Sequence, residues 1–167
     1  SLGNLAQRIL MFIAKNLDGY LPAIRGHQPA DTALFDVLAD ALQSEMPRAM
    51  QDLALSQGIE AWMRSVFACN AYVDEQAPWA LKKTDPERME TVLATLYIAI
   101  AQLAIAISPV IPASAKALLD HMGVPDDVRS IAAMGSHWYS PLAESNYQVG
   151  VPKPLFPRID LPAEDAE

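Results

Sequence analysis

Two pairs of polar residues stand one helical turn apart in otherwise apolar stretches of the sequence. Asn4 and Arg8 form the first pair, and Asn70 and Asp74 form the second. Residues four positions apart project from the same face of an α-helix. Asn offers donors and an acceptor, Arg offers donors and Asp offers acceptor oxygens, so two such faces could together read the edge of a nucleobase. Each pair taken alone has a simpler explanation, which is the ordinary polar surface of a helix.

Pro78 and Trp79 follow the second pair directly and interrupt its helical pattern. A proline fixes the bend, and a tryptophan held beside it at the surface could stack on a nucleobase, an interaction worth about 1–3 kcal/mol. The alternative is that Trp79 fills the core, as we expect for Trp62. Lys82 and Lys83 come one turn later and could contact phosphates, or they could form the solvated end of a helix.

Apolar residues at helical spacing predict the elements that must position these side chains. The first helix is expected to end at Asp18–Gly19, and the second to start near Asp31 or Thr32, with a kink or restart at Pro47 and a pattern that reaches Leu53. Three more helices are expected over about residues 56–76, 85–108 and 112–122. The candidate core positions of the 56–76 helix are Ile59, Trp62, Met63, Val66, Phe67 and Tyr72.

The stretch from Thr91 to Pro125 contains Lys116 and Asp120 as its only formal charges, so we expect it to form the centre of a helical bundle. In the helix expected over about residues 85–108, Asp85 can cap the N-terminus and Pro86 suits the first helical position. Its most apolar part, Val92 to Ile107, is shorter than the roughly 18–20 apolar residues that span a bilayer, so a buried helix is expected rather than a membrane span.

The composition changes after Gly135, where five of the 13 prolines fall. We therefore divide the chain into a helical bundle, residues 1–134, and an irregular Pro-rich extension, residues 135–167, that packs on the bundle or trails from it. The expected fold class is all-α, a bundle of four to six helices.

Several classes of function are disfavoured by composition and motif. The net charge of −8 argues against coating nucleic acid by charge alone, and the single cysteine, Cys69, excludes an internal disulfide and fits a reducing, cytosolic setting. No phosphate-binding loop, nucleophile elbow or metal-binding spacing of His and acidic residues is found, so we expect no catalytic residue and no metal site. The helical pattern already runs at Ser1, which suggests a piece of a longer protein.

The runs from Asn4 to Arg8 (NLAQR) and from Asn70 to Trp79 (NAYVDEQAPW) resemble the anticodon-binding domain of bacterial methionyl-tRNA synthetases, and the run from Pro154 to Ile159 (PLFPRI) is similar to that domain's end. The site residues that the resemblance implies are Asn4, Arg8, Asn70, Asp74, Pro78 and Trp79. It implies that Trp79 stacks on the splayed wobble cytosine of the CAU anticodon. The first pair would approach that base and its neighbour, and the second pair would help to build the pocket. Unstacked loop bases are commonly read in this way.

The resemblance also implies partners and a setting. The anticodon loop of methionine tRNA and a catalytic domain of the same polypeptide are the expected partners, in the cytoplasm, with neither membrane nor DNA involved. ATP and Mg would act in that catalytic domain, which activates methionine, so this fragment of a methionine–tRNA ligase is expected to hold no cofactor and to catalyse nothing by itself.

Two alternatives stay open at this point. The same bundle occurs in related class I synthetases, and a helical protein–protein adaptor could use Pro78 and Trp79 as a structural corner. A buried Trp79 without an adjacent groove would favour the adaptor.

Overall fold

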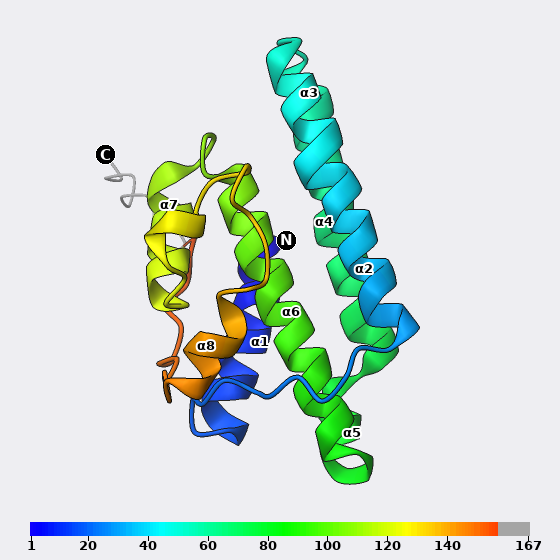
Figure 1. Ribbon diagram of the computed structural model, residues 1–167, viewed down its shortest axis with the longest axis vertical. Coiled ribbons are helices and arrows are strands. Elements are labelled where there is room, and N and C mark those ends of the chain that lie inside the picture. The colour runs from blue at the N-terminus through cyan, green and yellow to red at the C-terminus, as the bar shows by residue number, and fades with distance from the viewer. Residues whose placement is uncertain (157–167) are drawn as a thin grey trace, which may run out of the picture.

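The long apolar helix α6 (Pro86–Ile107) lies among the other helices of a bundle in the computed structural model, which describes residues 1–156 (Figure 1). The other helices are α1 (Leu2–Asn16), α2 (Pro29–Ala39), α3 (Met46–Gln51), α4 (Leu55–Gln76), α5 (Pro78–Thr84), α7 (Pro112–His121) and α8 (Tyr139–Glu144), with a π-helical turn η1 (Asp40–Glu45) and a 3-10 turn η2 (Asp126–Val128). Over the described range, β pairing is limited to an isolated antiparallel bridge between Tyr20 and Gln148. The predicted all-α bundle is confirmed.

The start of α6 and its central position in the bundle match the predictions made from the sequence. Asp85 caps the helix by accepting a hydrogen bond from the Arg88 backbone N–H at 3.0 Å, and Pro86 takes the first helical position. Every residue from Thr91 to Ile107 is buried, and α6 packs against α1, α2, α4, α5 and α7. With 22 residues, α6 is long and apolar enough to cross a membrane, whereas the sequence analysis expected its apolar part to be too short. The bundle nevertheless buries 94% of the most apolar window of α6. This helix is the core helix.

The helix α2 continues through η1 into α3 without a break, although Pro47 lies in the first turn of α3. Proline has no N–H to donate and its ring clashes with the carbonyl one turn earlier. The preceding π turn widens the helix there, with the Met46 N–H bonded to the Ala41 carbonyl. The expectation that the apolar pattern extends to Leu53 is wrong, because the helix ends at Gln51 and Leu53 lies 83% exposed in a left-handed turn.

The inner face of α4 carries Trp62, whose indole N–H donates to the Leu103 carbonyl at 2.9 Å. Val66 and Tyr72 are buried as expected, whereas Ile59 and Met63 are half-buried. Phe67 is not a core residue and is 63% exposed. The buried stripe of α4 follows the spacing of Trp62, Val66, Cys69 and Val73. A residue directly after Val66 points about 100° away from that stripe, toward solvent.

Residues 135–156 pack back on the bundle rather than away from it. Trp138 and Tyr139 are buried next to Tyr97 of α6, and the Tyr139 hydroxyl donates to the Pro22 carbonyl at 2.7 Å. Six residues of this segment form α8 and the remainder is irregular. The boundary between residues 134 and 135 stays a prediction. The part of the extension after Phe156, including Arg158 and Ile159 of the PLFPRI run, lies outside the described residues.

Candidate nucleic-acid interface

The C-terminal end of α4, the helix α5 and the outer face of α1 meet at one end of the bundle. Arg8 of α1 reaches Asp74 of α4, with 3.6 Å between the Nη2 and Oδ1 atoms. The same guanidinium carbon lies 5.6 Å from the centre of the Trp79 ring. Three of the residues predicted from spacing are therefore brought together from three different helices.

Trp79 is 45% exposed, whereas Trp62 is 8% exposed. The cause is the break between α4 and α5, where Ala77 adopts the left-handed conformation (φ 43°) and Pro78 begins the next helix. Pro78 itself is buried, so its ring supports the turn and leaves the exposed surface to Trp79. Of the two alternatives for Trp79, the structure excludes the core position.

The two asparagines differ in what they offer. Asn4 is exposed, while Asn70 is half-buried and donates its amide N–H to the Val66 carbonyl at 2.8 Å, one turn back in the same helix. The amide oxygen of Asn70 has no hydrogen-bond donor among residues 1–156. Asn4 and Arg8 line an open groove of about 470 Å³ that follows α1 as far as Asn16. The groove is lined by residues of α1, and Arg8 connects it to the Trp79 ring, an arrangement that the adaptor alternative did not predict.

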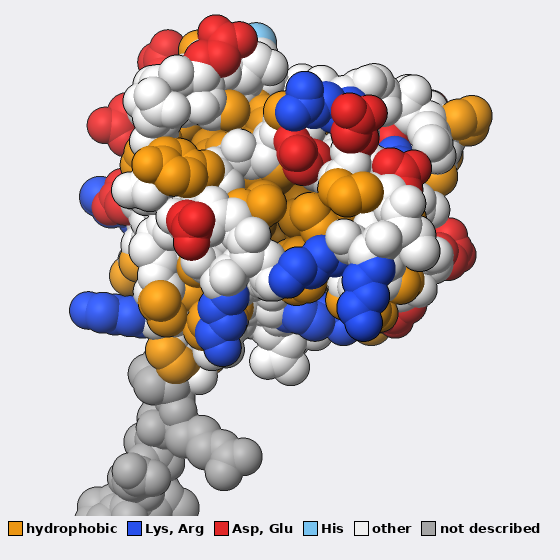
Figure 2. All heavy atoms as spheres, turned by 90° about the horizontal axis from the view of Figure 1, so that it is seen from below, with side chains coloured by type: hydrophobic (Ala, Val, Ile, Leu, Met, Phe, Trp, Pro, Cys, Tyr) orange, Lys and Arg blue, Asp and Glu red, His pale blue; other side chains and the backbone are white. Residues whose placement is uncertain are grey.

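Basic side chains lie along one side of this end of the bundle. Lys82 and Lys83 are exposed in the last turn of α5, and Lys15 is exposed near the end of α1. The Lys82 ammonium donates to the Asn16 side-chain oxygen at 2.7 Å, which ties α5 to α1. Figure 2 shows the end at which α5 lies: most Lys and Arg side chains gather along one side of it, and most acidic ones lie on the other. The positive charge of this acidic chain is thus concentrated locally.

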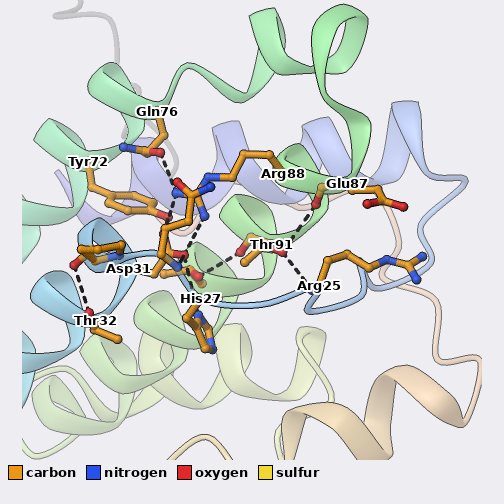
Figure 3. Close-up of polar contacts among 12 residues, drawn as sticks. Arg25, His27, Asp31, Thr32, Tyr72, Gln76, Glu87, Arg88 and Thr91 are labelled. Atoms are coloured by element: carbon orange, nitrogen blue, oxygen red, sulfur yellow. Dashed lines mark hydrogen bonds and ion pairs between the residues drawn. The ribbon is translucent and has the colours of Figure 1, made fainter.

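A buried ion pair between Asp31 and Arg88 braces the end of α4 that carries the site (Figure 3). The sequence analysis did not predict this pair. Asp31 of α2, 0% exposed, accepts hydrogen bonds from Arg88 of α6 at 2.6 and 2.7 Å and from the Tyr72 hydroxyl. The Gln28 backbone N–H donates to the same carboxylate at 2.8 Å, and Arg88 also donates to the side chain of Gln76 at 2.6 Å. Arg88 is the one basic residue of α6, between Glu87 and Glu90 at the start of a helix that is uncharged from Thr91 onward, and this is the signal that could have revealed the pair.

Competing effects set the pKa of Asp31. Burial raises it, but the hydrogen bonds from Arg88, Tyr72 and the Gln28 backbone outweigh burial and hold it below its usual value. The hydrogen bond to Asp31 raises the pKa of Arg88, so both groups stay charged. Burial, followed by the hydrogen bond to Asp31, raises the pKa of Tyr72, so its hydroxyl remains a donor. The cluster is a fixed structural support and not a reactive site.

Cys69 and His27 are two further titratable residues near the site. Cys69 is fully buried, and burial raises the pKa of its thiol to about 12, so the thiolate that a nucleophile needs is not formed near neutral pH. His27 approaches Asp31 at 3.8 Å and packs edge-on against Phe35. Within residues 1–156 there is no group of three or more His, Cys, Asp or Glu side chains placed to hold a metal ion.

Comparisons with known proteins point to one family. A family model described as the anticodon binding domain of methionyl tRNA ligase matches residues 21–166. The methionine–tRNA ligase of Brucella suis is 43% identical over 157 residues, which are 94% of this chain and 30% of that protein. The methionine–tRNA ligase of Mesorhizobium japonicum is 39% identical over 99% of this chain and 31% of its own length. The chain thus spans about a third of the curated relatives it matches.

Solved structures give the same result for the fold. The free-state methionyl-tRNA synthetase of Mycobacterium tuberculosis superimposes with a TM-score of 0.84 and 33% identity, over 96% of this chain and 32% of that one. A second structure of that enzyme, bound by methionyl-adenylate, gives a TM-score of 0.83 at 32% identity, over 93% of this chain and 30% of that one. The chain belongs to the family of anticodon-binding domains of methionyl-tRNA ligases.

Proposed function

We propose that this domain binds the CAU anticodon of a methionine tRNA as part of a cytoplasmic methionine–tRNA ligase. The ATP- and Mg-dependent activation of methionine belongs to a catalytic domain outside this sequence, and no residue of this chain takes part in that chemistry. The observation that carries the proposal is the half-exposed ring of Trp79, held beside Arg8 where α1, α4 and α5 meet, with an open groove along α1 that Arg8 also lines.

Trp79 offers its ring to the wobble cytosine, and Pro78 holds the turn that presents the ring. Arg8 already covers part of that ring, but an exposed cation–π contact is worth about 0.5–1 kcal/mol, whereas base stacking is worth about 1–3 kcal/mol. The Arg8–Asp74 ion pair is exposed at both ends and therefore weak. A base can displace the guanidinium from the ring, and Arg8 can then turn its donors to the base edge.

The remaining site residues complete the pocket. Asn4 is exposed on the same face of α1 as Arg8 and is free to hydrogen-bond the base or its neighbour. Asn70 and Asp74 form the wall on α4, where Asp74 orients Arg8. The exposed cations Lys82 and Lys83 contact phosphates of the loop. These donors and acceptors, rather than overall charge, give the site its selectivity.

The test is a titration of the 167-residue chain with hairpin RNAs whose loops contain CAU or UAU. Trp79→Ala should weaken CAU binding by about 1–3 kcal/mol, while Trp79→Phe retains part of the affinity. Leu55→Ala is the matched control, because it removes an exposed apolar side chain at the start of α4, the opposite end of that helix. The melting temperature should change little in either alanine variant.

Replacing cytosine by uracil exchanges an amino donor for a carbonyl acceptor and leaves a protein group unpaired. UAU should therefore bind more weakly by about 1–3 kcal/mol. Equal affinity for both hairpins, or a large fall in melting temperature for Trp79→Ala with unchanged RNA binding, would contradict the proposed function.

A further inference from the structure

The groove along α1 extends beyond the residues assigned above. Arg8 is shared between the groove and the Trp79 ring, and the groove continues past Met11 and Phe12 to Lys15 and Asn16. Met11 and Phe12 are half-buried, so the floor of the groove is apolar, while its far end is basic. Stacking on an aromatic ring beside a positively charged groove is the usual arrangement for single-stranded nucleic acid.

Asn16 holds the far end of the groove together. Its amide N–H donates to the Phe12 carbonyl at 2.8 Å, which orients the side chain, and its oxygen accepts from Lys82 at 2.7 Å. The partner of Lys82 is thus a neutral amide, which positions the ammonium without cancelling its charge. Neither Lys15 nor Lys82 forms an ion pair with any carboxylate of residues 1–156.

We propose that this groove binds the ribose and phosphate of the nucleotide next to the base that stacks on Trp79. Lys15 and Lys82 contact its flanking phosphates, the apolar floor packs against the ribose, and Asn16 is the positioning residue of Lys82. The inference rests on the proposed function, since it is Trp79 that fixes the neighbouring base. It adds two residues of α1, Lys15 and Asn16, whose part in binding does not follow from the motifs.

The salt dependence of binding tests the two lysines. Each phosphate contact to single-stranded RNA contributes a slope of about −0.7 in log K against log salt. The double variant Lys15→Ala/Lys82→Ala should therefore flatten the slope by about 1.4. Taking the affinities in 1 M salt as the reference, each lost lysine should weaken binding about fivefold at roughly 0.1 M salt. Arg48→Ala on α3 removes one exposed positive charge from the end of the bundle far from α5 and should change neither quantity.

The base preference separates the two proposals. The double lysine variant should flatten the salt slope equally for CAU and UAU hairpins, because phosphate contacts do not read sequence. The slope reports the lost phosphate contacts even where loss of the Lys82–Asn16 bond loosens α5. If Trp79→Ala weakens CAU binding but the double lysine variant leaves both affinity and salt slope unchanged, the groove is refuted and the Trp79 site stands. If Trp79→Ala has no effect, the proposed function fails first.

Asn16 gives a test that a merely structural role would not pass. Asn16→Asp keeps an oxygen for Lys82 but neutralises its charge, so RNA affinity should fall about fivefold, as for loss of Lys82. Both Asn16→Asp and Asn16→Ala lose the amide donor to the Phe12 carbonyl, so a small fall in melting temperature should be common to the two variants. Asn16→Ala releases Lys82 without neutralising it and should reduce affinity less. An Asn16→Asp variant with unchanged affinity and salt slope would overturn the assignment.

Discussion

Removing the carboxylate of Asp31 should destabilise this domain more than any change at its surface. In Asp31→Ala, Arg88, which is 8% exposed in the native domain, keeps the side chain of Gln76 as an acceptor but loses its carboxylate partner. Leaving one member of a buried ion pair unpaired costs about 3–5 kcal/mol. Because domains of this kind unfold with a free energy of about 5–15 kcal/mol, that loss is a large fraction of the total.

The size of the loss follows from the bonds that Asp31 accepts. The carboxylate receives two hydrogen bonds from Arg88, one from the Tyr72 hydroxyl and one from the Gln28 backbone, and thereby joins α2, α4 and α6. The assay is urea denaturation of Asp31→Ala, Arg88→Met and the double variant. Their coupling free energy should lie toward the upper end of the roughly 0.5–3 kcal/mol seen for contacting residues, because the double variant carries no unpaired charge.

The pH dependence gives an independent check with a definite sign. The pKa of Asp31 is lower in the folded state than in the unfolded state. The stability that the ionised Asp31 carboxylate gives to the folded domain is therefore fully present above about pH 4, the ordinary pKa range of an Asp carboxyl. It is lost as the pH falls through the lowered folded-state pKa, where the folded state must bind a proton. Asp31→Ala should therefore show a flatter fall in unfolding free energy below pH 4. A loss under about 1 kcal/mol at pH 7, or parallel pH profiles, would refute the reasoning.

Three further predictions concern stability and reactivity. Ala77→Gly should leave the domain as stable or more stable by up to about 1 kcal/mol in urea denaturation, because Ala77 adopts a left-handed conformation that glycine adopts without strain. Leu96→Ala in the centre of α6 should cost about 2–5 kcal/mol, whereas Phe67→Ala at the surface should change stability by less than about 0.5 kcal/mol in the same assay. Cys69 should react with a thiol reagent only as fast as the domain unfolds, so rapid modification of the native protein would contradict its burial.

Local sequence signals, such as caps, prolines and apolar spacing, were enough to predict most of the helices. The cap of Asp85, the proline after it and the nearly uncharged stretch that follows specify α6 without reference to the remainder of the chain. What local signals could not specify is which side of a helix is covered. Phe67 and Val66 are adjacent apolar residues of α4, and only the packing of α4 against its neighbours decides that one is exposed and the other buried.

The candidate site was predictable in its residue types and less so in its arrangement. Spacing placed Arg8 and Asp74 on helix faces, but it could not show that the two faces meet, nor whether Trp79 is covered. Asp31 and Arg88 are 57 positions apart, so their pairing depends on tertiary structure that no periodicity contains. Polar residues that act together across helices are the part of a site that a pattern along one helix cannot reveal.

The exposed ring of Trp79 depends on this hidden pairing. Arg88 donates to Gln76, the last residue of α4, which directly precedes the left-handed turn at Ala77. The far end of the short helix α5 is fixed by the Lys82–Asn16 hydrogen bond. A seven-residue helix has too few internal hydrogen bonds to be stable by itself, so its position must come from these two attachments and from its packing on α6. Because both ends are held, a large ring can stay at the surface in a fixed orientation, and a base that stacks on it need not supply the cost of ordering it.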